Sequence, residues 1–176
     1  LTATPQRLSD QIRLNQVGYY PNSTKIAIVT GKMPAYSFAV VSADGKDTLF
    51  EGLTGKQLKS AYSSTITRIV DFTPFTDTGD FMLRVTGVKH PFPFKIRNEA
   101  YNDLGKSVLK GFYYQRSSIP LEEKYAGKWS RAAGHPDTVV LIHPSAVIDN
   151  RPGGITISSP GGWYDAGDYN KYIVNC

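Results

Sequence analysis

The first half of the chain alternates between apolar and polar residues over short runs, which is the pattern of β-strands with one buried face. Between Ile12 and Ile96 these runs are rich in β-branched and aromatic residues, and turn-forming residues separate them. An Asp-Gly pair within Ser42–Asp47 predicts a hairpin turn between two runs. Five runs are predicted as strands: residues 25–30, 36–42, 65–72, 80–86 and 92–96.

Strands at this spacing predict an immunoglobulin-like β-sandwich over residues 1–97, since an antiparallel sheet with one solvated face must bury the other against a second sheet. This half contains neither Cys nor Trp, so the disulfide and tryptophan of antibody domains are absent. The aromatic run His90–Phe94 is the one candidate for an exposed sugar-binding row in this half. We predict instead that Phe92 and Phe94 pack in the core or at an interface.

At Asn98 the apolar period changes from that of a strand to that of a helix. Tyr101, Leu104, Val108 and Phe112 follow helical spacing, which predicts a helix that Asn98 caps and that runs to about Arg116.

Beyond this helix the sequence is irregular, and residues 138–142 are the only run that resembles a strand. One helix and an irregular stretch cannot bury a core of their own, so residues 98–176 are predicted to be the opening of a larger, all-α domain. The alternative is an appendage that packs on the sandwich.

Composition and charge exclude several classes of protein. The 176 residues carry a formal charge of +5, but the basic residues are spread from Arg7 to Lys171 without a cluster, which argues against nucleic-acid binding. No run of apolar residues is long enough to span a membrane, and the first residues do not resemble a signal peptide, so we expect any export signal to have been removed. The single cysteine, Cys176, rules out an internal disulfide and does not indicate a compartment.

The segment SPGGWYDAGDYNKYIVN, residues 159–175, concentrates the candidate chemistry of the chain. Asp165 and Asp168 stand three residues apart, a spacing that can bring two carboxylates to one water molecule, while Trp163, Tyr164 and Tyr169 could stack on a sugar ring. Three simpler readings stay open. The segment could be an ordinary turn, its aromatic residues could be core, or its acids could bind calcium, although it supplies few oxygen ligands for that.

Two motifs resemble glycoside hydrolase family 9, the inverting cellulases and related β-glucanases. The sequence GGWYDAGDYNKYIVN resembles the catalytic-base segment of that family, and IRLNQVGYYPNSTKIAIV, residues 12–29, resembles the opening of the immunoglobulin-like domain that precedes many of its catalytic domains. The resemblance implies a toroid of six α-helical hairpins, in which Asp168 is the general base and Asp165 holds the same water. It places the general acid on a glutamate far downstream, which this chain does not contain.

These implications define the expected function. The chain is expected to be the N-terminal part of an inverting β-1,4-glucan hydrolase that acts on cellulose, mixed-linkage glucan or xyloglucan outside the cytoplasm. Without the rest of its catalytic domain, in the same or a second chain, it is expected to be inactive. The alternative is a non-catalytic immunoglobulin-like module that binds polysaccharide or a protein.

No cofactor is expected to be required. Some family members hold a structural zinc through Cys and His residues, but here only His135 and His143 occupy the corresponding stretch, so zinc is not expected. His135 is predicted to be a hydrogen-bonding loop residue or part of the cleft wall that meets substrate. Asp137 and Asp149 are candidates for calcium ligands or caps.

Overall fold

The structure is a computed structural model that describes residues 10–31, 36–167 and 169–171. The chain divides into two compact units, residues 1–104 and residues 105–176, which are described separately below. The boundary expected at residues 97 and 98 falls within the first unit, shortly before this division.

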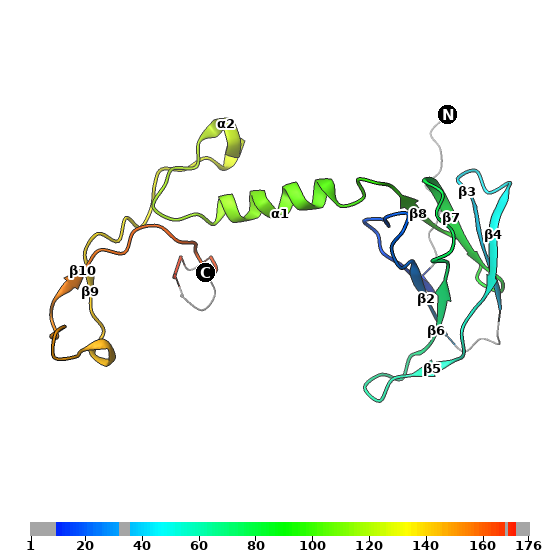
Figure 1. Cartoon of the computed structure of the whole chain (residues 1–176), viewed down its shortest axis with the longest axis horizontal. Coiled ribbons are helices and arrows are strands. Elements are labelled where there is room, and N and C mark those ends of the chain that lie inside the picture. Colours follow the sequence, from blue (N-terminus) through cyan, green and yellow to red (C-terminus); the bar gives the residue numbers. More distant parts are fainter. Residues whose placement is uncertain (1–9, 32–35, 168, 172–176) are drawn as a thin grey trace. The chain divides into compact units, whose positions relative to one another are not determined.

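The first unit is a sandwich of two antiparallel four-stranded sheets (Figure 1), as the alternating pattern predicted. One sheet has the order β1 (Ile12–Arg13), β2 (Ile26–Thr30), β6 (Ile66–Asp71), β5 (Leu58–Lys59). The other has the order β4 (Thr48–Leu53), β3 (Ser37–Ser42), β7 (Gly79–Val85), β8 (Phe92–Ile96). The predicted hairpin turn joins β3 to β4, where the amide of Gly45 donates to the carbonyl of Ser42 (2.8 Å).

The alternating apolar residues of both sheets meet in one core. Phe72, Phe81 and Phe94 form its aromatic centre, and the Phe94 ring centroid lies 5.1 Å from that of Phe72 and 5.8 Å from that of Phe81. Phe94 is buried, and Phe92 is partly buried against the same cluster. The expectation that these two residues pack rather than form an exposed row is therefore confirmed.

Lys25 is the largest fully buried side chain of the described residues. Its ammonium group donates to the carbonyl oxygens of Pro21 (2.6 Å) and Ser23 (2.9 Å), so the buried cation is satisfied by backbone acceptors. Burial lowers the pKa of this amine, and the nearby carboxylate of Asp71 acts in the opposite direction.

The predicted helix is α1 (Asn102–Tyr114), which begins four residues after the expected cap, Asn98. Tyr101 explains the late start, because the sandwich holds it in the preceding turn. Its ring lies 5.2 Å from that of Tyr20, and its hydroxyl accepts a hydrogen bond from Asn15. The amide of Asn102 then closes the turn by donating to the carbonyl of Glu99 (3.0 Å).

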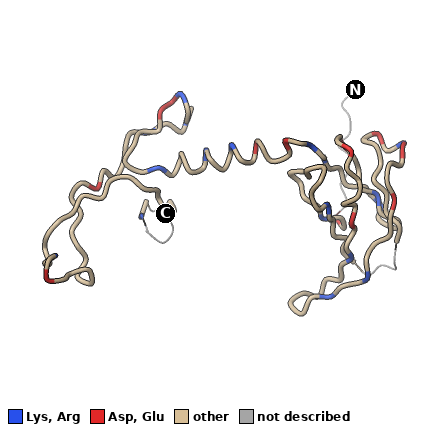
Figure 2. Tube along the Cα trace, viewed as in Figure 1, with Lys and Arg blue, Asp and Glu red and all other residues tan. Residues whose placement is uncertain are grey.

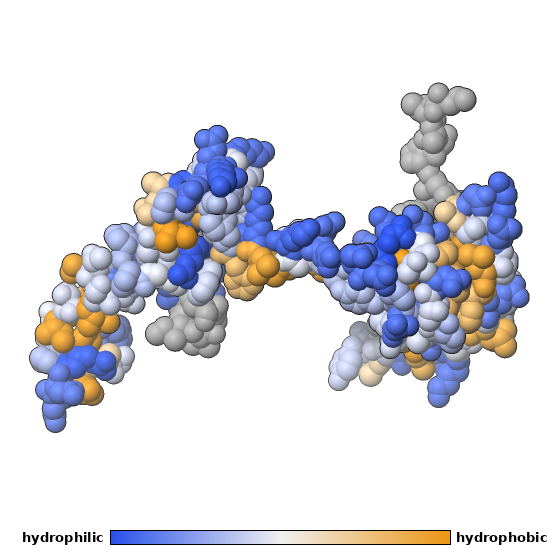
Figure 3. All heavy atoms as spheres, turned by 45° about the horizontal axis from the view of Figure 1, so that its top comes forward, coloured by the Kyte–Doolittle hydropathy of each residue, from blue (hydrophilic) through white to orange (hydrophobic). Residues whose placement is uncertain are grey.

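No residue of α1 is buried, although its apolar side chains share the predicted periodicity. Leu104, Val108, Leu109 and Phe112 are between 44% and 71% exposed. They contribute to the apolar surface seen along the helix in Figure 3.

The rest of the second unit consists of short elements joined by loops. They are α2 (Glu123–Ala126), the 3-10 helix η1 (Gly127–Trp129), β9 (Val140–Leu141), the 3-10 helix η2 (Pro144–Ala146) and β10 (Thr156–Ile157). Strands β9 and β10 pair antiparallel, so the strand expected over residues 138–142 forms only at its centre. Among its described residues, this unit buries few apolar side chains: Leu121, Ala126, Ile142 and Tyr164. Such a sparse core fits the opening of a larger domain.

Lysine and arginine residues are interspersed with acidic ones along the described chain (Figure 2). No helix within the described ranges has the length and apolar character needed to cross a membrane.

Candidate active site

The first residues of the loop that contains the predicted catalytic residues pair with the segment that follows α1. The amide of Tyr164 donates to the carbonyl of Gln115 (2.9 Å), and the amide of Ser117 donates to the carbonyl of Gly162 (3.1 Å). A β-bridge between Arg116 and Trp163 lies between these two bonds. The entry of the loop is therefore fixed by backbone pairing.

Asp165 begins a closed turn. Its amide donates to the carbonyl of Asn170 (2.8 Å), and the amide of Tyr169 donates to the carbonyl of Ala166 (3.2 Å). Residues 165–167 are exposed, so the Asp165 side chain stands on the surface of the turn. Asp168 lies outside the described residues, and its approach to Asp165 stays a prediction.

Trp163 and Tyr164, which are predicted to stack on a sugar, both have partners within the chain. The Arg116 guanidinium lies 4.4 Å from the centre of the Trp163 ring, and the Phe112 and Trp163 rings are nearly perpendicular with their centroids 6.5 Å apart. Tyr164 is only 5% exposed, and the Arg131 guanidinium lies 5.4 Å from its ring. In this structure the Tyr164 ring is buried and packs against the rings of His135 and Tyr169.

Tyr169 is 52% exposed, as a residue that stacks on a sugar would be. Its backbone has a positive φ of 61°. The ring is stacked near that of His135, with centroids 6.2 Å apart and planes inclined by 29°. His135 also meets the edge of Tyr164 at 5.4 Å, so the structure brings these three predicted residues together.

Two cavities border the turn and share Tyr169 as a lining residue. The first, of about 450 Å³, is also lined by His135, Asp137, Gly161 and Lys171. The second, of about 420 Å³, is also lined by Trp129, Arg131, Ala166 and Gly167. Volumes of this size can each hold part of an oligosaccharide.

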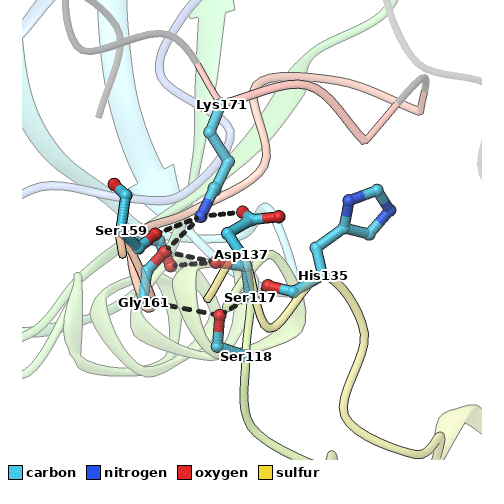
Figure 4. Close-up of polar contacts among 8 residues, drawn as sticks. Ser117, Ser118, His135, Asp137, Ser159, Gly161 and Lys171 are labelled. Atoms are coloured by element: carbon cyan, nitrogen blue, oxygen red, sulfur yellow. Dashed lines mark hydrogen bonds and ion pairs between the residues drawn. The ribbon is translucent and has the colours of Figure 1, made fainter. Parts of the chain in front are cut away.

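The exit of the loop depends on Lys171, for which the sequence predicts no role. Its ammonium group donates to the carbonyls of Ser159 (3.1 Å) and Gly161 (3.0 Å) and forms an ion pair with Asp137 (Figure 4). Ser117 and Ser118 were also missed. Their hydroxyls bind the backbone of Gly161 and His135 respectively (2.6 and 2.7 Å). The position of Lys171 shortly after the two aspartates is the only signal in the sequence that could have indicated it.

The residues considered as metal ligands have other contacts. Asp137 pairs with Lys171, and Nδ1 of His143 lies 2.8 Å from the Ser145 hydroxyl and accepts from its amide, which caps η2. Asp149 lies exposed in a turn. Within the described ranges no group of three or more His, Cys, Asp or Glu side chains could hold a metal ion. The pair His135 and His143 is thus not arranged as a zinc site there, and the metal content of the protein stays a prediction.

The β-sandwich and the loop that contains Asp165 together indicate an immunoglobulin-like domain followed by the first part of an enzyme domain. Residues 7–90 match the cellulase N-terminal ig-like domain, and residues 101–176 match glycosyl hydrolase family 9. The chain therefore belongs to glycosyl hydrolase family 9, as the two sequence motifs indicated.

Named relatives agree with this family. A xyloglucan-specific endo-beta-1,4-glucanase from Bacteroides ovatus is 48% identical over 95% of this chain and 28% of its own length. Endoglucanase D from Acetivibrio thermocellus is 30% identical over 96% of this chain and 26% of its own length.

Solved structures give the same result. Bacteroides ovatus GH9 matches with a TM-score of 0.77 at 47% identity, covering 94% of this chain and 30% of that one. A single mutant of a thermostable endoglucanase from Alicyclobacillus acidocaldarius matches with a TM-score of 0.71 at 29% identity, over 93% of this chain and 27% of that one. The chain thus spans between a quarter and a third of these proteins' length.

Proposed function

We propose that the chain is the N-terminal part of an inverting β-1,4-glucan hydrolase. In this proposal Asp168 removes a proton from the attacking water and Asp165 holds the same water. A glutamate in the remainder of the catalytic domain protonates the leaving oxygen from the other face of the sugar, because inversion needs room for water between the two groups.

The observation that carries the proposal is the closed, exposed turn at Asp165, which borders two cavities that share Tyr169. An exposed carboxylate beside an exposed aromatic ring is suited to a sugar, since the ring can stack on its apolar face while the acid reaches a water at the anomeric carbon. His135, Trp163 and Tyr169 are proposed to contact substrate, and the buried Tyr164 to support the turn.

We further propose xyloglucan as the first substrate to test, because the relative with 48% identity is a xyloglucan-specific enzyme. Cellulose and mixed-linkage glucan are the other candidates. A polymeric glucan cannot enter a cell intact, so the proposed substrate implies an exported protein. Neither a metal ion nor another cofactor is needed for proton transfer between water and carboxylates.

The test needs a protein of the length of the relatives. Hydrolysis of xyloglucan, mixed-linkage glucan and soluble cellulose should be followed by release of reducing ends, and NMR should identify the first anomer released. Inversion of a β-linkage predicts the α-anomer. Asp168→Ala should lower kcat by at least about 10²–10⁴-fold, and Asp165→Ala should be similarly severe but could leave trace activity.

The control is Asp149→Ala, which removes an exposed acid from a turn of the same unit. It should leave kcat unchanged. Full turnover by Asp168→Ala would overturn the proposed role of the loop. Binding of glucan by the whole protein without any hydrolysis would instead favour the non-catalytic binding module.

A further inference from the structure

Lys171 lies at the point where the turn at Asp165 leaves the loop. Its three ammonium protons face three acceptors: the carbonyls of Ser159 and Gly161, at 3.1 and 3.0 Å, and the carboxylate of Asp137. A lysine has three donors and no acceptor. The contacts within the chain therefore use its whole hydrogen-bonding capacity and leave no donor for a substrate.

The ion pair is shielded from solvent. The side chains of Lys171 and Asp137 are 19% and 23% exposed. Charges in such an environment interact more strongly than exposed ones, and removing one partner leaves the other poorly compensated. This pair is consequently a better anchor than an ordinary surface salt bridge.

The anchor connects segments that are far apart in the sequence. The amide of Ser159 donates to the backbone carbonyl of Asp137 (2.8 Å), so the segment around Asp137 and the segment before the loop are also joined directly. The hydroxyl of Ser118 bridges the same two segments, since it donates to the carbonyl of His135 (2.7 Å) and accepts from the amide of Gly161 (2.9 Å). Figure 4 shows these contacts around the Lys171 ammonium group.

Three residues in the segments joined by these contacts have an unusual backbone conformation. Ser118, His135 and Asp137 all have positive φ angles, of 63°, 49° and 45°. Side-chain-bearing residues adopt this conformation at a cost in energy, and they keep it where surrounding contacts hold them. The hydrogen bonds and the ion pair centred on Lys171 supply such contacts.

We propose that Lys171, through Asp137, is a positioning residue that holds the described residues of the turn, 165–167 and 169–170, against the segments 135–137 and 159–161. Trp163 and Ser117 fix the entry of the loop, and Lys171 fixes its exit. The effect on turnover rests on the function proposed above, whereas the effect on the order of the turn does not depend on it.

The first experiment measures amide hydrogen exchange by mass spectrometry in a protein of the length of the relatives. In Lys171→Ala the amides of Ser159, Asp165 and Tyr169 should exchange at least about tenfold faster than in the unsubstituted chain, because the turn opens locally. Asp137→Asn should have the same effect to a smaller degree. Lys171→Arg, which keeps the charge and donors, should restore most of the protection.

Matched controls are Lys124→Ala and Asp149→Asn, which remove exposed charges elsewhere in the second unit. Both should exchange like the unsubstituted chain. If Lys171→Ala also matches these controls, the anchor is wrong, whatever the protein hydrolyses. Lys171→Ala could instead lower protection throughout residues 105–176, and the other two variants then test the proposal. The proposal is overturned if the amides of the turn are equally protected in Lys171→Ala, Asp137→Asn and Lys171→Arg.

The second experiment measures glucan hydrolysis by the whole protein. Misplacing a catalytic group by about 1 Å can cost about 10²-fold, so Lys171→Ala should lower kcat by about 10–100-fold. KM should change less than about twofold, because Lys171 has no donor left for substrate. Lys171→Arg should recover part of kcat. The variant Lys171→Met/Asp137→Asn should lose less than the sum of its two single substitutions, since it leaves no unpaired charge.

The two proposals fail in different ways. If the unsubstituted whole protein hydrolyses no glucan, the proposed function fails, and hydrogen exchange still decides the anchor. If exchange increases in Lys171→Ala while kcat stays unchanged, the anchor exists but does not position the reacting groups. A large rise in KM at constant kcat would make Lys171 a binding residue and would also overturn the proposal.

Discussion

Ser117 illustrates how one buried polar side chain fixes the entry of the loop. It is completely buried, and its hydroxyl donates to the carbonyl of Gly161 at 2.6 Å and lies 3.1 Å from that of Gly162. A buried hydroxyl without such acceptors would be strongly unfavourable. The burial of this serine is therefore tied to the path of residues 161 and 162.

Replacing Ser117 by Ala should lower the free energy of unfolding of its unit by about 1 kcal/mol, the usual net contribution of one hydrogen bond. Urea unfolding followed by tryptophan fluorescence would measure it, since Trp163 lies beside this segment. Ser158→Ala removes a hydroxyl from an exposed position nearby and should change stability by less than about 0.5 kcal/mol. Equal stability of the two variants would contradict the assigned hydrogen bonds.

Asp71 should make the first unit sensitive to acid. The side chain and amide of Thr73 hydrogen-bond the Asp71 carboxylate and lower its pKa from the ordinary value of 3.8. A carboxylate with a lowered pKa stabilises the fold fully above its ordinary pKa, and this stabilisation is lost as the pH falls through the folded value. The melting temperature of Asp71→Asn should therefore fall less between pH 5 and pH 2 than that of the unsubstituted chain. Asp77→Asn, which alters an exposed acid, should melt like the unsubstituted chain across this range.

At the site, the residues able to act on a sugar could be predicted from the sequence, whereas the contacts between distant side chains could not. Asp165 and Tyr169 are candidates from the sequence alone, because a carboxylate can transfer a proton and an aromatic ring can stack on a sugar whatever their partners are. Tyr164 was expected to share that role, but its burial depends on Arg131 and His135, which lie far from it in the sequence. Lys171 was missed for the same reason. Its role depends on its hydrogen-bond acceptors, and the sequence does not show which residues these are.

At the scale of elements, the period of α1 was predictable and its start was not. The spacing of apolar residues is a local property, whereas the first turn is held by contacts of Tyr101 with Asn15 and Tyr20, which are set by the sandwich. The strands β2, β3, β6, β7 and β8, of five to seven residues, were predicted from alternation. The six-residue β4 was missed, because none of its residues is buried, and β1 and β5, with two residues each, are too short to show a period.

Two glycines within α1 give a prediction for this helix. A methyl group at Gly105 or Gly111 would meet no atom within 4 Å, so substitution by Ala costs nothing in packing. Each change should stabilise the helix by up to about 1 kcal/mol, because glycine is a poor helix former. Far-UV circular dichroism of the double variant should show more helix than the unsubstituted chain. Gly127→Ala is the matched control, and it should destabilise, since Gly127 has a positive φ of 56°.

At the scale of the whole molecule, the two units were predicted with unequal success. The sandwich has a dense core, so five of its eight strands follow from the apolar pattern. The second unit has a sparse core and depends on hydrogen bonds between loops, for which sequence periodicity gives no signal. That it opens a larger domain was nevertheless predictable, because one helix and an irregular stretch cannot bury a core of their own.

The exposed face of α1 should make the 176-residue chain associate with itself. Leu109 and Phe112 are 71% and 59% exposed, and contiguous apolar surface of this kind favours association. Sedimentation velocity at increasing concentration should detect oligomers, and Leu109→Lys with Phe112→Lys should reduce them. Tyr62→Lys changes an isolated exposed ring in the first unit and should leave association as it was. Oligomers that persist in the double lysine variant would show that another surface is responsible.

The burial of Lys25 also gives the first unit a built-in chemical reporter. Amine-reactive reagents label lysines that solvent can reach, and the Lys25 amine is enclosed by the carbonyls of Pro21 and Ser23. Acylation at this residue, read by peptide mass spectrometry, should occur only when the sandwich opens. The extent of labelling at Lys25 relative to the exposed Lys46 would then measure the unfolded fraction of this domain within any longer protein, including one whose other domains dominate its melting curve.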